Sequence, residues 1–344
     1  MQQRNFNLDV MRCVAVIHIL CSHFLLHANF YFNGPVTGPA MEISLILRQF
    51  FHSCVPIFLM LSGYLMNRKT LSVKYYKGIS KILILYGLAC IPIWIYRTIY
   101  ENAIYTLGGI FNSFVNFEFY SWYIGMYVCL YLMIPFFNNM YHKLETKQNK
   151  MILIGTLILL TSMPSLLNHF GVALIPTYFE AFYPLTYYFM GAFISEYADD
   201  FKLSSTALFI IYLTVMIAGG CFVLTQVKDK FYYDVALFVD HGHLLNICST
   251  PLLFLTILKS DYSKVPKPLC KLVQTISLVS LQLYLVSYAF DVRVYTEFNA
   301  KYWGYTDRFM RFPIPVFKVF ILSFITALII QFLYDQIKKI STRS

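Results

Sequence analysis

The sequence is poor in charged residues and has almost no long polar segments. Of its 344 residues, 13% are charged and 58% are hydrophobic. Soluble domains carry about 25% charged residues, so this shortage excludes a soluble fold and predicts a multi-pass integral membrane protein. The net charge of +10 would favour nucleic-acid binding in a soluble protein. Here the basic residues lie mainly in short loops, as in a membrane topology signal, and we expect no nucleic-acid partner.

The sequence also lacks closely paired cysteines. Its eight cysteines are scattered, mostly within apolar segments, and none forms a CxxC pair. This spacing argues against a disulfide framework and against a zinc site, so we expect no metal. The first apolar segment contains His18 and His23 and has no small-residue cleavage site, so we expect it to remain as the first span rather than be removed as a signal peptide.

Ten apolar segments are long enough to cross a bilayer, which predicts an all-α bundle of about ten transmembrane helices. They lie near residues 7–30, 43–66, 80–99, 120–140, 151–168, 178–197, 205–226, 243–259, 273–292 and 314–336. No repeat or polar domain interrupts them, so we expect residues 1–344 to form a single transmembrane domain with no appended soluble domain. Most basic residues fall in loops on the side of the two termini, which predicts that both termini are cytoplasmic.

The first apolar segment carries Asp9, Arg12 and His23. Arg12 and His23 are eleven residues apart, about three helical turns, so both side chains should lie on one helix face roughly 16 Å apart. Asp9 lies one turn before Arg12 on that face, within reach for an ion pair. Ionisable groups in an apolar helix are costly in lipid, so the three should face the protein interior or a wet cavity. The alternative is that Asp9 and Arg12 extend to the headgroups while His23 bonds a neighbouring helix.

These residues belong to a longer motif. Arg4–Ala15 reads RNFNLDVMRCVA, which resembles the first helix of the membrane acyltransferase 3 family, R-x-x-x-L-D-x-x-R-x-x-A followed by a histidine eleven residues after the second arginine. Val55–Tyr64 reads VPIFLMLSGY, similar to the end of the family's second helix. Further similar blocks contain Trp122 and Gly191. Ser287 departs from the pattern, because a histidine is common there.

The resemblance implies an O-acetyltransferase that moves an acetyl group from cytoplasmic acetyl-CoA to a cell-surface polysaccharide or its lipid-linked precursor, in the cytoplasmic membrane. His23 is then the expected catalytic residue. A neutral imidazole can take a proton from a sugar hydroxyl, and an acetyl-histidine relay is equally compatible. Arg12 is suited to binding a CoA phosphate or to holding Asp9. The separation of roughly 16 Å along the helix is similar to the length of an extended pantetheine arm.

The loop after the second span is basic and could bind the phosphates of acetyl-CoA. Its cationic residues are Arg68, Lys69, Lys74, Lys77 and Lys81. A topology signal that also contacts anionic lipid is the alternative interpretation.

Three residues near the outer ends of the spans are candidates for binding the glycan acceptor: Glu118, Trp122 and His241. An aromatic ring beside polar groups could stack on a sugar and hydrogen-bond it, although anchoring at the membrane interface is the alternative. Two other functions also remain open. A glycolipid transporter or flippase would place charges in a polar cavity, and a polysaccharide polymerase would carry a large outer loop with basic residues.

Overall fold

The computed structural model describes residues 5–32, 34–168, 172–232 and 238–341. Within these ranges the regular structure is helical, apart from an isolated bridge between Val36 and Lys228. The all-α prediction is therefore confirmed. Arg4, which opens the first-helix motif, lies outside the described residues.

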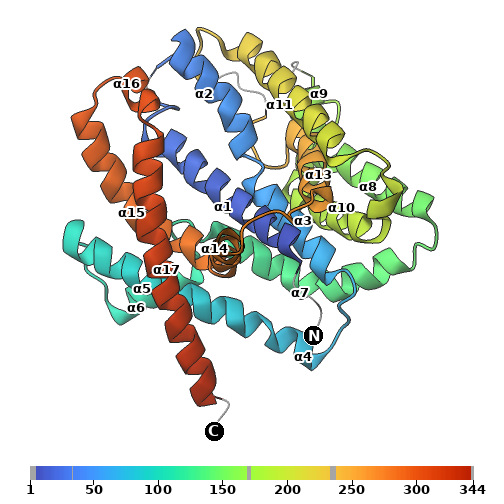
Figure 1. Cartoon of the computed structure of the whole chain (residues 1–344), viewed down its shortest axis with the longest axis horizontal. Coiled ribbons are helices and arrows are strands. Elements are labelled where there is room, and N and C mark those ends of the chain that lie inside the picture. The colour runs from blue at the N-terminus through green and yellow to red at the C-terminus, as the bar shows by residue number, and fades with distance from the viewer. Residues whose placement is uncertain (1–4, 33, 169–171, 233–237, 342–344) are drawn as a thin grey trace.

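The helices form one bundle, in which α17 crosses the face turned toward the viewer in Figure 1. Their bounds are α1 Phe6–His27, α2 Gly38–Phe51, α3 Cys54–Met66, α4 Val73–Lys77, α5 Ile79–Tyr100, α6 Leu107–Val115, α7 Trp122–His142, α8 Lys147–Thr161, α9 Pro164–Leu167, α10 Tyr183–Tyr197, α11 Ser205–Val227, α13 Leu244–Lys259, α14 Lys267–Leu278, α15 Ser280–Lys301, α16 Tyr305–Met310 and α17 Pro313–Ser341. Short 3-10 helices span Thr177–Phe182 and Ala198–Asp200.

Seven helical segments of the described chain are long and apolar enough to cross a membrane, or eight if the bent pair α14–α15 is one span. Each of the ten predicted segments contains a helix, but α10 and α13 have only 15 and 16 residues. Both are shorter than the roughly 20 residues of a straight span. The protein is therefore a multi-pass membrane protein, and the count of ten spans stays a prediction.

The predicted second span is broken into α2 and α3. The chain turns at His52 and Ser53, and α3 begins at the next residue. A break leaves backbone groups without helical partners. The carbonyl oxygen of His52 accepts hydrogen bonds from His241 Nδ1, at 3.1 Å, and from Asn246 Nδ2, at 3.3 Å. The break therefore fixes the loop that carries His241 against the bundle.

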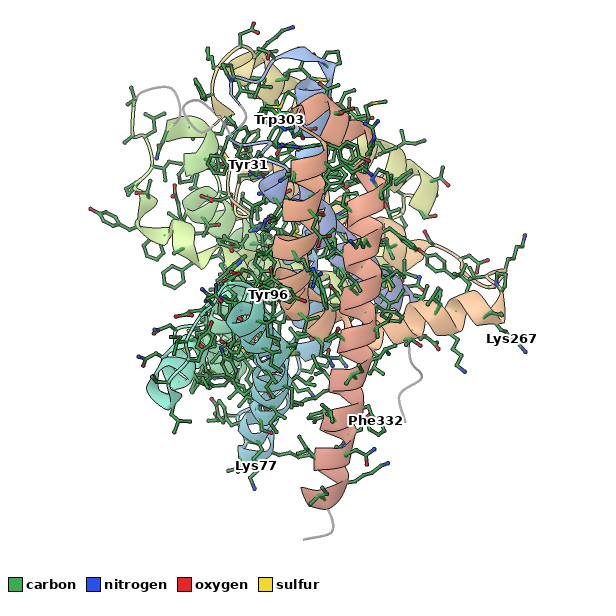
Figure 2. All side chains as sticks on the ribbon, turned by 90° about the vertical axis from the view of Figure 1, so that its left-hand side faces the viewer. Tyr31, Lys77, Tyr96, Lys267, Trp303 and Phe332 are labelled. Carbon is green, nitrogen blue, oxygen red and sulfur yellow. The ribbon has the colours of Figure 1, made fainter. Side chains whose placement is uncertain are left out.

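The predicted ninth span also departs from a straight helix, because α14 and α15 meet at an angle of 72°. Figure 2 shows α14, with Lys267 at its outer end, extending away from the bundle nearly at right angles to α17. The exposed side of α14 includes Leu269 and Leu272 beside lysines. Such a mixed surface is typical of a helix that lies along a membrane interface.

Helices α3 and α10 pack at backbone distance. A Cβ atom added to Gly63 would overlap the carbonyl oxygen of Tyr188, and one added to Gly191 would overlap that of Met60. Small residues allow this contact between membrane helices. The contact matters for the site because α3 forms one of its walls.

We expect Gly191→Ala to destabilise the protein by about 1–3 kcal/mol, because the backbone that the new methyl group meets cannot move aside without repacking. Thermal unfolding of the purified protein in detergent measures the effect. Gly155→Ala on α8 is the matched control, since nothing lies within 4 Å of the Cβ that it adds. Equal unfolding temperatures for Gly191→Ala and wild type would contradict the packing described here.

Candidate active site

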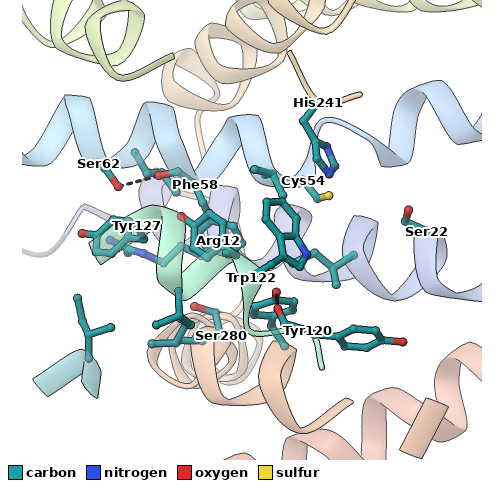
Figure 3. Close-up of a pocket in the computed structure, with 18 of the residues that line it drawn as sticks. Arg12, Ser22, Cys54, Phe58, Ser62, Tyr120, Trp122, Tyr127, His241 and Ser280 are labelled. Atoms are coloured by element: carbon teal, nitrogen blue, oxygen red, sulfur yellow. Dashed lines mark hydrogen bonds between the residues drawn. The ribbon is translucent and has the colours of Figure 1, made fainter. Parts of the chain in front are cut away.

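A cavity of about 430 Å³, here called the central cavity, lies among α1, α3, α7 and α15. Arg12 and His23 both line it. The prediction that these two residues share one face turned to the protein interior is therefore confirmed. Figure 3 shows Arg12 and Tyr127 toward one end of this cavity, and Trp122 and His241 toward the other.

His23 is hydrogen-bonded to a buried carboxylate from the far end of the sequence. Its Nδ1 lies 2.8 Å from Oδ2 of Asp291 on α15, and the Asp291 side chain is fully buried. A carboxylate oxygen accepts, so Nδ1 donates this bond, and in the neutral imidazole that donates from Nδ1 the lone pair is on Nε2. The His23 side chain is 14% exposed, so it is buried but still reachable from the cavity.

Tyr120 and His27 extend this arrangement. The Tyr120 hydroxyl donates to the same Asp291 oxygen at 3.0 Å, and it accepts from His27 Nε2 at 2.6 Å. The Tyr120 ring also lies against His23, with centroids 4.0 Å apart. Asp291 is thus held by two donors, and the orientation of the His23 ring is fixed from two sides. In zinc sites and hydrolases, a carboxylate in this position sets the histidine tautomer and ring direction.

Sequence reasoning did not single out Asp291 as a partner of His23. Asp291 lies within α15, near the end of the predicted span 273–292. The available signal was a carboxylate within the last turns of an apolar segment, where an unpaired charge is costly. The sequence gives no indication of which helix would supply its partner.

The predicted ion pair between Asp9 and Arg12 is present. Arg12 Nη1 lies 3.4 Å from Asp9 Oδ1, which also accepts from Ser277 Oγ at 2.6 Å. Asp9 is 1% exposed. Asp9 therefore acts on Arg12 and the α14–α15 junction, about four turns away from His23.

A second cavity of about 1020 Å³, here called the basic-end cavity, adjoins the central cavity. Arg12, Tyr127, Ser280 and Leu281 line both cavities. Of the predicted donor-binding residues, Arg68, Lys69 and Lys81 line the basic-end cavity. This cavity is therefore lined by several cationic side chains, and it borders the central cavity, which His23 lines.

Lys74 and Lys77 are not brought to this cavity. They lie on the short helix α4, where both are exposed. Tyr75 is the residue of α4 that turns inward, and its ring stacks on Tyr131 with centroids 4.5 Å apart. The lysines beside it consequently point away from the bundle. Their predicted role in donor binding is not supported by their position.

At the opposite end of the central cavity lies a third cavity of about 610 Å³, here called the outer cavity. Trp122 and His241 line both the central and the outer cavity, and their rings stack at 5.8 Å. The structure thus brings together two of the three predicted acceptor residues. The third, Glu118, is exposed and does not line any of these three cavities.

Ser287, which replaces a histidine common in the similar family, is fully buried. Its hydroxyl donates to the carbonyl oxygen of Tyr284 on its own helix, at 2.8 Å. Ser287 lines none of the three cavities. Instead, α15 provides the partner of His23 one turn after Ser287, at Asp291.

The apolar spans surround a buried histidine–carboxylate pair, and a cationic cavity lies beside it. This arrangement defines an integral membrane protein suited to group transfer within the bilayer. The chain belongs to the acyltransferase 3 family, whose acyltransferase domain matches residues 5–334. The protein is therefore a membrane acyltransferase. No curated protein and no solved structure matches the chain.

Proposed function

We propose that this acyltransferase transfers an acetyl group from cytoplasmic acetyl-CoA to a hydroxyl group of a cell-surface polysaccharide or its lipid-linked precursor. The observation that carries the proposal is the His23–Asp291 pair at the wall of the central cavity, between a cationic cavity and an outer cavity. The first suits an anionic donor, and the second suits a polar acceptor.

The donor occupies the basic-end cavity. Acetyl-CoA carries several phosphate charges, and Arg68, Lys69 and Lys81 supply cations for them. Cationic loops stay on the cytoplasmic side of a membrane, where acetyl-CoA is found, so this end of the bundle and both termini face the cytoplasm. Arg12 stands at the boundary of the two cavities, held by Asp9 and Ser277, and it binds the donor arm on its way to His23.

The chemistry needs a base for a weak nucleophile. His23 Nε2 takes the proton of the acceptor hydroxyl while the oxygen attacks the thioester carbonyl carbon. The carbon–sulfur bond then breaks, and the imidazolium returns the proton to the departing CoA sulfur. Asp291 holds the tautomer with Nε2 free and stabilises the imidazolium that forms. In a relay, Nε2 instead attacks the thioester first and carries the acetyl group to the alcohol.

The proposal is tested by giving the purified protein radiolabelled acetyl-CoA and a panel of glycans, and by measuring both transfer and thioester hydrolysis. The double variant Arg68→Gln/Lys69→Gln should raise the KM for acetyl-CoA about tenfold, because it removes charge-assisted phosphate contacts. Lys74→Gln/Lys77→Gln removes the same charge from α4, outside the cavity, and should leave KM close to that of wild type.

Two outcomes would overturn the proposal. Wild-type protein that neither hydrolyses nor transfers acetyl would contradict acetyl-CoA as donor. Equal KM changes in the two double variants would show that the basic segment acts through general charge, as in membrane topology or lipid contact, and that the basic-end cavity does not bind the donor. A glycolipid flippase would translocate lipid without consuming thioester, so the same assay separates that function.

A further inference from the structure

The outer cavity differs from the basic-end cavity in the sign of its charges. Glu180, from the turn Thr177–Phe182, and Asp240 both line it. The outer cavity therefore holds two carboxyl groups. Among the described residues that line this cavity there is no lysine or arginine.

His243 adds a buried hydrogen-bond donor to the same cavity. It is 2% exposed and lines the wall. Its Nδ1 accepts from the backbone N–H of Asn246 at 3.2 Å and so caps the start of α13. With Nδ1 as acceptor, the proton of the neutral ring is on Nε2.

No described group of the protein accepts this proton, because Nε2 of His243 is buried without a hydrogen-bond partner. A buried donor without an acceptor costs free energy unless a ligand or water completes it. An oxygen atom of a molecule in the outer cavity would provide that acceptor. The unpartnered nitrogen therefore points to a ligand rich in hydroxyl or ether oxygens.

Trp122 supplies the apolar surface such a ligand needs. It is 44% exposed, and its ring is held nearly parallel to His241, with an interplanar angle of 16°. His241 is in turn fixed by its hydrogen bond to the carbonyl oxygen of His52 at the break between α2 and α3. An indole face at the boundary of the outer and central cavities can pack against the C–H face of a sugar ring while its hydroxyls reach the carboxylates.

From these four groups we infer that the outer cavity is the acceptor subsite and that it selects an uncharged sugar. Glu180 and Asp240 accept hydrogen bonds from sugar hydroxyls, His243 donates to a sugar oxygen, and Trp122 packs against the ring. A sugar that carries a carboxylate is rejected by the two acidic side chains, since like charges at close range cost free energy and no lysine or arginine is among the described residues that line the cavity. The inference rests on the proposed acetyl transfer and names the class of its acceptor.

The test compares acceptors that differ in a single group. Methyl glucoside and methyl glucuronide, and the corresponding galactose pair, differ only in whether carbon 6 is a hydroxymethyl group or a carboxylate. With wild-type protein and labelled acetyl-CoA, we expect kcat/KM for the better neutral sugar to exceed that of its acidic partner at least tenfold. In the double variant Glu180→Gln/Asp240→Asn the ratio should fall below threefold. Asp307→Asn, an exposed carboxylate change outside the cavity, should keep the wild-type ratio.

A second variant tests the hydrogen bond that His243 donates to the sugar. His243→Asn keeps a side-chain oxygen able to cap α13 but removes the Nε2 proton, so it should raise the KM for the neutral sugar about tenfold with little change in kcat. Hydrolysis of acetyl-CoA without any sugar distinguishes the possible failures. If hydrolysis is absent in wild type, the proposed function fails. If hydrolysis persists while acidic and neutral sugars react equally, or while no neutral sugar reacts, the acceptor inference alone is overturned.

Discussion

His23→Gln is expected to lower the rate of acetyl transfer to a sugar hydroxyl by about 10²–10⁴-fold, the range that a general base contributes. Glutamine is close to histidine in size, and its amide N–H can still donate to Asp291, so the helix contact is kept while the basic lone pair is lost. The measurement is single-turnover transfer of labelled acetyl at saturating donor and acceptor. His18→Gln is the matched control, because His18 lies on the same helix, bonds Ser53 and lines none of the three cavities.

Hydroxylamine as acceptor separates the two mechanisms left open for His23. Its nitrogen is an unprotonated nucleophile at neutral pH and needs no base to attack a thioester. If His23 is the general base, the glutamine variant should transfer acetyl to hydroxylamine nearly as fast as wild type. If His23 carries the acetyl group, both acceptors should fail in the variant. Transfer to sugar within threefold of wild type would remove His23 from the reaction altogether.

Asp291→Asn is the second substitution with a large expected effect, a loss of about 10²–10⁴-fold in sugar acetylation. The amide can donate to His23 Nδ1, which moves the ring proton to Nε2 and leaves no lone pair facing the cavity. It also provides no charge to stabilise the imidazolium. The measurement is kcat with the preferred sugar, together with the rate of transfer to hydroxylamine, which should be far less affected.

Tyr120→Phe provides the graded comparison for this prediction. It removes one of the two donors to Asp291 and keeps the carboxylate, so its loss in rate should be smaller than that of Asp291→Asn. A thermal unfolding curve for each variant shows whether the fold survives, because a lone change at a fully buried carboxylate also alters packing. If Asp291→Asn folds and retains a third or more of wild-type kcat, the histidine–carboxylate pair has no catalytic meaning.

The sequence predicts the features of this protein that are set locally. The shared face of Arg12 and His23, and the ion pair of Asp9 with Arg12, follow from helical geometry within one segment. The close contact at Gly63 follows from the absence of a side chain. Helical class and membrane character follow from composition. In each case the physical cause acts over a few residues, so the pattern can be read without the fold.

The rest depends on contacts between distant segments. Asp291 lies 268 residues from His23, and nothing in either segment indicates the other. The outer cavity similarly joins the start of α7, the turn before α10 and the loop before α13. The sharp bend between α14 and α15 also escaped prediction, since the serine-rich segment around Ile276 has the composition of a continuous span. The sequence also did not show which basic residues line the basic-end cavity: Lys74 on α4 is exposed and does not line it, while Lys69, five residues earlier, does.

The shared walls of the three cavities have a consequence for how the protein works. Because the basic-end and outer cavities each border the central one, the donor and the acceptor of the proposed reaction would reach the central cavity from opposite sides. Neither the nucleotide nor the sugar would then have to pass through the bundle, and the acetyl group alone would change sides. Such a transfer would need no alternation between inward-facing and outward-facing shapes, and CoA would leave through the same basic-end cavity by which acetyl-CoA enters.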